Sequence, residues 1–173
     1  NISPVQLRRR GLAAEVRAAL DASGLAPERL ELEVTESVVL QDTEEALGTL
    51  RQLKSLAASL ALDDFGTGYS SLSSMVRVPF DRVKIDRSFV IGLGRRADCT
   101  AIVRAVSGLC ASLGLSTTAE GVETPEQLAM LMAERVAEAQ GHLFSPARPG
   151  PEIAARFGAG VEPAWPATDP SAP

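Results

Sequence analysis

Residues 61–72 read ALDDFGTGYSSL, and two acids stand side by side in this stretch, at positions 63 and 64. The apolar run at 60–62 predicts a short buried strand that ends at this pair. Adjacent carboxylates repel each other, so a cation is needed to hold them together. Gly66 and Gly68 let the backbone leave the strand sharply, so that the two acids need not point to opposite faces.

The same unit of strand, polar end and helix recurs along the chain. Alternating or short apolar segments predict further strands at 30–34, 82–86, 115–119 and 136–139. Amphipathic segments between them predict helices, of which one is capped by Thr43 and another runs from Asp98 to Gly114. Alternating strands and helices are typical of an α/β protein with a parallel sheet of about five strands, and Asn1 is expected at the end of a sixth.

Two helix starts carry capping boxes. Ser3 with Gln6 predicts the start of a first helix, which continues to Gly24 with Leu12, Val16 and Leu20 on one face. Thr124-Pro125-Glu126-Gln127 predicts a second such start after the strand at 115–119.

Composition indicates one globular domain. The 173 residues are 45% hydrophobic and 23% charged, with a net charge of −5, which argues against a surface for DNA or RNA polymers. No apolar run approaches the roughly 20 residues of a membrane span. Cys99 and Cys110 lie eleven residues apart in one predicted helix, too far to form a disulfide, so we expect reduced thiols and a cytoplasmic protein.

The C-terminal part of the chain differs from the rest in amino-acid composition. Seven of the eleven prolines lie between Pro146 and Pro173. We therefore expect a folded domain over 1–149, and a tail over 150–173 with a short helical patch at 152–157 and no fixed structure beyond it.

Acidic residues recur where the predicted strands end. The steps between Glu33, Asp63, Asp86 and Glu120 are 30, 23 and 34 residues, close to the length of one strand-helix unit. The carboxyl ends of parallel strands converge, both in a barrel and in an open doubly wound sheet. Converging carboxylates repel each other unless hard cations lie among them, and oxygen ligands suit Mg²⁺ or Mn²⁺. This pattern predicts a two-metal centre that cleaves phosphoesters.

Each residue also has a simpler interpretation. Glu33 in an alternating strand can face solvent, and Lys84 and Asp86 on one strand face can form a solvated ion pair. Asp63 and Asp64 can cap a helix and form a turn. Their joint placement at successive strand ends favours the metal centre.

Six stretches, in order, resemble the EAL-domain family of cyclic-di-GMP phosphodiesterases: NISP (1–4), ELEVTES (31–37), LDDFGTGYSSL (62–72), VKIDRSFV (83–90), AEGVET (119–124) and QGHLFSPARP (140–149). The resemblance implies a TIM-like (β/α) barrel with its site at the strand carboxyl ends. It also implies hydrolysis of cyclic di-GMP to linear pGpG with two Mg²⁺ or Mn²⁺ ions, in bacterial second-messenger signalling.

The resemblance also implies roles for individual residues. The metal ligands are Asn1, Glu33, Asp63, Asp64 and Glu120, with Asp63 bridging both ions and Glu120 as ligand or general base. Lys84 orients the attacking water, Asp86 supports it, and Gln140 is a site glutamine. Glu123 anchors the mobile loop that contains DFGTGYSS, and the loop at 65–74 shapes a homodimer.

The chain departs from the family pattern in a few places. The Glu-Ala-Leu motif that names the family would lie upstream of Asn1, so we expect a barrel incomplete at its N-terminus, active as a full domain and inactive as the isolated 173-residue chain. The alternative is an inactive module that binds nucleotide or protein. Ala57 and Arg135 stand where the family commonly has glycine, which we expect to affect loops and not chemistry.

Overall fold

The computed structural model of the protein describes residues 1–36, 44–66 and 77–157. Among these residues one parallel sheet is formed by β1 (Glu31–Thr35), β2 (Ser59–Phe65), β3 (Arg82–Ile85), β4 (Ser116–Ala119) and β5 (Glu138–Ala139). The helices are α1 (Pro4–Arg8), α2 (Leu12–Ser23), α4 (Glu44–Lys54), α6 (Arg87–Ile91), α7 (Ala97–Leu113), α8 (Pro125–Ala133) and α9 (Gly150–Phe157), with a 3-10 turn η1 (Pro27–Arg29).

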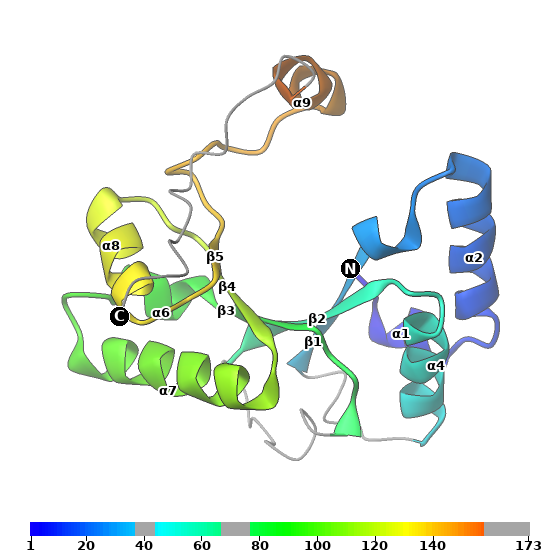
Figure 1. Ribbon diagram of the computed structural model, residues 1–173, viewed down its shortest axis with the longest axis horizontal. Coiled ribbons are helices and arrows are strands. Elements are labelled where there is room, and N and C mark those ends of the chain that lie inside the picture. The colour runs from blue at the N-terminus through cyan, green and yellow to red at the C-terminus, as the bar shows by residue number, and fades with distance from the viewer. Residues whose placement is uncertain (37–43, 67–76, 158–173) are drawn as a thin grey trace.

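The strand order distinguishes a barrel wall from a doubly wound sheet. The order is β1-β2-β3-β4-β5, and all four pairings are parallel. Each connection therefore moves one step in the same direction, whereas a doubly wound sheet reverses direction at a switch point. In Figure 1, α1, α2 and α4 flank the β1–β2 end of the sheet, and α6, α7 and α8 flank the β3–β5 end. This is the arrangement of part of a (β/α) barrel.

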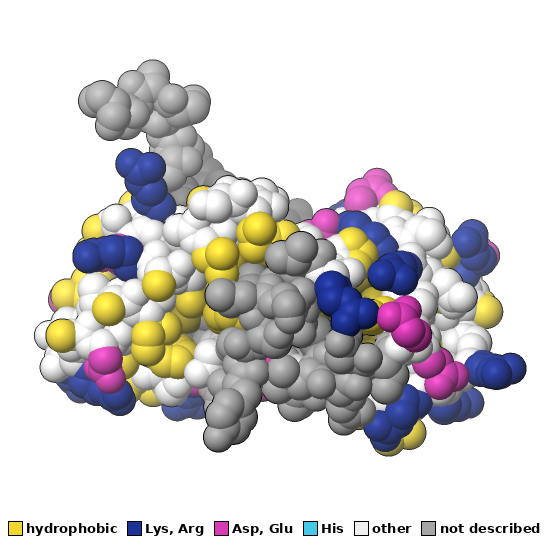
Figure 2. All heavy atoms as spheres, turned by 90° about the horizontal axis from the view of Figure 1, so that it is seen from below, with side chains coloured by type: hydrophobic (Ala, Val, Ile, Leu, Met, Phe, Trp, Pro, Cys, Tyr) yellow, Lys and Arg dark blue, Asp and Glu magenta, His cyan; other side chains and the backbone are white. Residues whose placement is uncertain are grey.

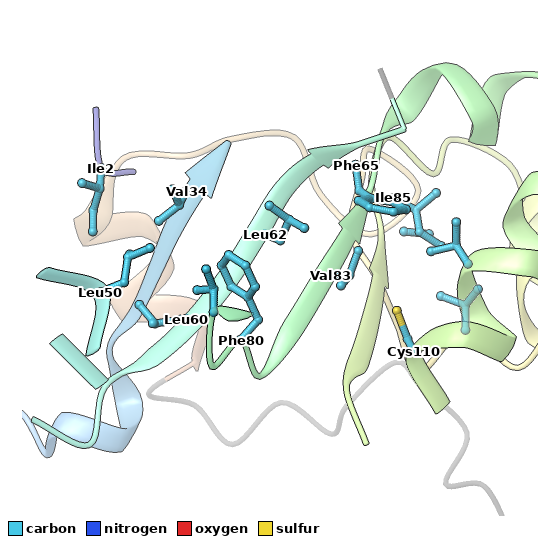
Figure 3. Close-up of a cluster of buried hydrophobic side chains, with 14 of the residues drawn as sticks. Ile2, Val34, Leu50, Leu60, Leu62, Phe65, Phe80, Val83, Ile85 and Cys110 are labelled. Atoms are coloured by element: carbon cyan, nitrogen blue, oxygen red, sulfur yellow. The ribbon is translucent and has the colours of Figure 1, made fainter. Parts of the chain in front are cut away.

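One face of the sheet is apolar and builds the core. Side chains alternate along each strand, so that Val34, Leu60, Leu62, Val83 and Ile85 all fall on this face and are almost completely buried. Figure 3 shows these residues beside Leu50 of α4 and Cys110 of α7. The opposite face carries the polar strand residues. Because the apolar face packs against the helices, these polar residues are on the face that points to the interior of a (β/α) barrel.

The N-terminal helix differs from the single helix predicted between Ser3 and Gly24. It is divided into α1 and α2: Arg9 is extended and ends α1, and Gly11, with φ +97°, directly precedes α2. The predicted capping box is present: the Ser3 side chain accepts a hydrogen bond from the backbone N–H of Gln6, and the Gln6 side chain accepts one from Ser3. Gly24 ends α2 in the left-handed conformation, as expected.

The other predicted helix signals are also present. Gly114 ends α7, and the Thr124–Gln127 capping box starts α8. Cys99 and Cys110 of α7 are free thiols, as predicted, and both are buried. The predicted cap Thr43 lies outside the described residues.

A backbone hydrogen bond joins the N-terminal residues to the outer edge of β1. The backbone N–H of Ile2 donates to the carbonyl of Glu33 at 2.8 Å, a contact of the kind that a neighbouring strand makes. Asn1 therefore lies next to the carboxyl end of β1, close to the position predicted for the end of a sixth strand.

The predicted C-terminal tail is only partly described. The helical patch predicted at 152–157 falls within α9, and residues 158–173 lie outside the described part of the chain. In Figure 1, α9 stands apart from the sheet and the other helices.

The surface mixes charges of both signs. Figure 2 shows basic and acidic side chains lying next to each other over the end of the molecule that carries α1, α2 and α4, where Arg9 and Glu15 form an ion pair. Among the described residues, no helix has the length and apolarity needed to cross a membrane.

Candidate metal centre

Lys84 lies at the middle of a cluster of carboxylates on the polar face of the sheet. Its Nζ is 2.5 Å from Glu33 Oε1 of β1, 3.2 Å from Asp63 Oδ1 of β2, and 2.6 Å from Oε1 of Glu120, which directly follows β4. The Lys84 side chain is only 6% exposed. Residues far apart in the sequence thus meet at the carboxyl ends of four neighbouring strands, where the sequence pattern predicted a site.

The two adjacent acids belong to β2 itself. The predicted strand ended at residue 62, but β2 continues through both acids to Phe65. The pairing of β2 with β3 shifts register between Leu62 and Phe65, and Asp64 adopts φ +57°. This bulge, centred on Asp64, breaks the strict alternation of side chains. It turns the acids toward one site before the chain reaches Gly66, so the bulge does what we had expected of the glycines.

Three carboxylates have the spacing of a metal site. One oxygen each from Asp63, Asp64 and Glu120 lies within 4.8 Å of the others. Asp63 Oδ1 is buried and accepts no hydrogen bond from the described residues, and its contact with the Lys84 ammonium at 3.2 Å is an ion pair. A buried carboxylate oxygen that accepts no hydrogen bond, in a set made only of oxygens, fits a hard divalent cation.

The electrostatics show that negative charge is in excess. Burial raises the pKa of Glu120, and Asp63 and Glu33 add to the rise, while the Lys84 ammonium acts against it. Burial and then the carboxylates of Asp63 and Asp86 raise the pKa of Asp64. Burial opposes the charge of Lys84, but its hydrogen bonds to Glu120 and Glu33 outweigh this and raise its pKa above the ordinary 10.5. One ammonium does not balance these acids, so further positive charge is favoured.

A second charged layer lies beneath the first. Arg82, two residues before Lys84 on β3, forms ion pairs with Glu31 of β1 at 3.4 Å and Glu138 of β5 at 2.5 Å. One guanidinium thus reaches strands two positions away on either side, which indicates that the sheet curves toward this face. A cavity of about 360 Å³ is lined by these three residues together with Lys84, Thr118, Ala139, Gln140, Gly141, Phe144 and Ser145.

The other predicted site residues lie around this cluster. Asn1 is exposed beside β1, and Gln140 is exposed at the end of β5, where it lines the same cavity as Lys84. Asp86 follows β3 and accepts a hydrogen bond from the N–H of Ser88 at 2.9 Å, which caps α6. The simple ion pair considered between Lys84 and Asp86 is not what Lys84 forms, because its partners come from other strands.

Glu36 is a residue that sequence reasoning missed. It directly follows β1, is 5% exposed, and its Oε2 accepts a hydrogen bond from the N–H of Gly66 at 3.2 Å, where the loop after β2 begins. Glu123, to which anchoring of this loop was assigned, is exposed next to α8, and its backbone N–H donates to Gln127. The signal in the sequence was a second acid three residues after Glu33. The rest of the loop, 67–76, lies outside the described residues, so the anchoring role of Glu123 and the dimer contact at 65–74 stay predictions.

Comparisons with known proteins find relatives over most of the chain. A family model described as "EAL domain" matches residues 1–147. The cyclic di-GMP phosphodiesterase NbdA of Pseudomonas aeruginosa is 43% identical over 145 residues, which are 84% of this chain and 18% of that protein.

Solved structures are similar over most of the chain. The EAL domain of Mycobacterium smegmatis DcpA is 42% identical with a TM-score of 0.88, covering 94% of this chain and 73% of that one. Klebsiella pneumoniae BlrP1, in complex with manganese and cyclic di-GMP, is 34% identical with a TM-score of 0.76, covering 82% of this chain and 36% of that one. The chain spans less than a third of the length of the curated relatives that it first matches.

Proposed function

The chain belongs to the EAL-domain family, and from this membership we propose that the protein is a phosphodiesterase that hydrolyses cyclic di-GMP to linear pGpG in bacterial second-messenger signalling. We propose Mg²⁺ or Mn²⁺ as its two metal ions, and the cytoplasm as its location. The observation that carries the proposal is the convergence of Asp63, Asp64 and Glu120 around one point, beside Glu33 and Lys84.

The chain offers enough oxygen ligands for two ions. Asp63 contacts Lys84 at 3.2 Å and has an oxygen within 4.8 Å of oxygens of both Asp64 and Glu120, which supports it as the ligand that would be shared by the two ions. Glu33 and Asn1 lie next to each other at the end of β1 and would complete the set on that side. Bound there, the ions would polarise the phosphodiester and lower the pKa of the attacking water. BlrP1, solved with manganese and cyclic di-GMP together, supports this choice.

The remaining residues would position the reactants. Hydrolysis adds water to phosphorus and breaks one P–O bond, and the leaving ester oxygen takes up a proton. The Lys84 ammonium has three donors and would orient the attacking oxygen. Glu120, whose pKa burial raises, is suited to accept the proton that this water loses. Asp86 would add negative charge near Asp64, and Gln140, which lines the same cavity as Lys84 after β5, would contribute its side-chain amide.

The test is turnover by the full-length protein. Incubated with cyclic di-GMP and Mg²⁺ or Mn²⁺, it should release pGpG, detected by liquid chromatography, and a chelator should stop the reaction. Asp63→Asn should lower kcat by about 10²-fold or more, as loss of a group that stabilises the transition state does. Glu134→Gln, which removes the ion pair between the C-terminal end of α8 and Arg104 of α7, should leave turnover unchanged.

Two results would reject the proposal. One is a folded, metal-loaded protein that makes no pGpG. The other is an Asp63→Asn variant that turns over like the wild type. If the protein binds cyclic di-GMP without cleaving it, the alternative applies, in which the domain is a nucleotide-binding or protein-interaction module.

A further inference from the structure

The Lys84 ammonium lies among carboxylates that are also proposed to bind the metal ions. It contacts Glu33, Asp63 and Glu120 at 2.5, 3.2 and 2.6 Å. Two of these, Asp63 and Glu120, also belong to the group whose oxygens lie within 4.8 Å of one another. The same carboxylates therefore serve an internal cation and the proposed metal ions.

The two kinds of cation cannot both keep these contacts without cost. Mg²⁺ binds carboxylate oxygens at about 2.0–2.1 Å. A divalent ion on Glu33 or Glu120 would then lie a few ångströms from a buried ammonium that hydrogen-bonds to the same side chains. Like charges at that separation, in a region where Lys84 is only 6% exposed, repel each other with little screening by solvent.

We propose that Lys84 is a built-in counter-ion that competes with the divalent cations for Glu33 and Glu120. In the metal-free protein it holds the carboxylates together, and it must release at least one of them when metal binds. It therefore lowers the metal affinity of the site while it stabilises the metal-free fold. This inference rests on the metal centre of the proposed function and does not require hydrolysis.

Arg82 provides a matched control on the same strand and the same face. It also pairs with two carboxylates from other strands, Glu31 and Glu138, but neither belongs to the metal-spaced group. A purely structural role for Lys84 predicts that Lys84 and Arg82 variants behave alike. A competing counter-ion predicts that only loss of Lys84 strengthens metal binding.

The experiment is titration of the full-length protein with Mn²⁺ alone, by calorimetry and by electron paramagnetic resonance, without nucleotide. Lys84→Met should bind Mn²⁺ about tenfold more tightly or better, and should melt at a lower temperature than the wild type when metal-free. Lys84→Arg, which keeps the charge, should not bind more tightly. Arg82→Met should melt lower with unchanged Mn²⁺ affinity. If metal-free Lys84→Met does not fold, Lys84→Gln and competition against a chelator, starting from the Mn²⁺-loaded protein, give the same comparison.

The outcomes separate this inference from the proposed function. Equal or weaker Mn²⁺ binding by folded Lys84→Met and Lys84→Gln overturns the counter-ion role, even if the protein hydrolyses cyclic di-GMP. Tighter binding by these variants supports it, even if no hydrolysis is found. If neither the wild type nor any variant binds Mn²⁺, the counter-ion role and the metal centre both fail.

Discussion

A methyl group on Gly141 would lie 2.2 Å from the carbonyl oxygen of Val122 and 2.3 Å from its amide nitrogen. This close backbone approach joins the end of β5 to the loop after β4. The N–H of Val122 donates to the carbonyl of Gln140 at 3.0 Å, and the N–H of Leu143 donates to the carbonyl of Val122 at 3.0 Å. Gly141 thus holds Gln140 next to the loop that begins at Glu120.

Gly141→Ala should therefore strongly destabilise the protein. The added methyl group meets backbone and not a flexible side chain, so strands or loops must move, at a cost of about 3 kcal/mol or more. For a chain of this size, that lowers the melting temperature by about 6–12 °C, measurable by circular dichroism. Gly108→Ala is the control: Gly108 lies in α7 with open space around it, so alanine should stabilise by about 0.5–1 kcal/mol. A Gly141→Ala variant that melts like the wild type would show that this contact is not required.

Two residues in loops carry backbone strain that glycine would relieve. Ala57 has φ +68° and Arg135 has φ +59°, and both stand where the family resemblance places glycine. A non-glycine residue in this conformation costs about 1–2 kcal/mol, of which part is regained because glycine is more flexible in the unfolded chain. We expect Ala57→Gly and Arg135→Gly each to raise the free energy of unfolding by about 0.5–1 kcal/mol, measured by urea denaturation. Ala101→Gly, at an exposed position in α7, should lower it, and a similar loss at Ala57 would contradict the strain.

Much of the fold and of the site could be predicted because the signals are local. Alternation of apolar and polar residues locates the strands, and an acid at a strand's carboxyl end is a property of a few neighbouring positions. Glu33, Asp63 and Glu120 were named on that basis, and the structure brings them together with Asp64 and with Lys84, whose role the family resemblance implied.

What could not be predicted depends on contacts between distant segments. Asp86 is the nearest acid to Lys84 along β3, yet Lys84 pairs with three other strands, because side chains on one face meet across the sheet more readily than along it. The bulge at Asp64 depends on how β2 pairs with β3, and the contact between Glu36 and Gly66 spans thirty residues. The break between α1 and α2, with an extended Arg9 and a positive φ at Gly11, is not revealed by the apolar pattern.

Asp64 combines an unfavourable charge with a conformation that asparagine shares. Burial and the carboxylates of Asp63 and Asp86 raise its pKa, so its negative charge is disfavoured in the metal-free protein. Its φ of +57° suits asparagine and strains alanine. Asp64→Asn should therefore raise the melting temperature of the metal-free protein, while its affinity for Mn²⁺ falls by about tenfold or more, as for loss of an anionic ligand. Asp64→Ala should lose the same affinity without the gain in stability. Unchanged Mn²⁺ binding by Asp64→Asn would exclude Asp64 as a ligand.

Glu120 makes the stability of the metal-free protein depend on pH in an unusual direction. Burial raises its pKa above the ordinary value of 4.5, with Asp63 and Glu33 adding to the rise and Lys84 opposing it. The folded protein therefore binds more protons at Glu120 than the unfolded chain does at pH values above 4.5, so this contribution to stability falls as pH rises through that window. Glu120→Gln removes the charge. In the presence of a chelator, its melting temperature relative to the wild type should rise between pH 4.5 and 7.5.

Glu134 provides the opposite case in the same titration. The hydrogen bond from Arg104 lowers the pKa of Glu134, so the charged form is favoured in the folded protein. Its contribution is present above pH 4.5 and is lost as pH falls, which makes Glu134→Gln less stable than the wild type at neutral pH and nearly equal to it in acid. The two variants should thus diverge with rising pH, one above the wild type and one below. Parallel profiles would mean that burial does not disfavour the Glu120 carboxylate, and Mn²⁺ should abolish the advantage of Glu120→Gln because the bound ion favours the charged ligand.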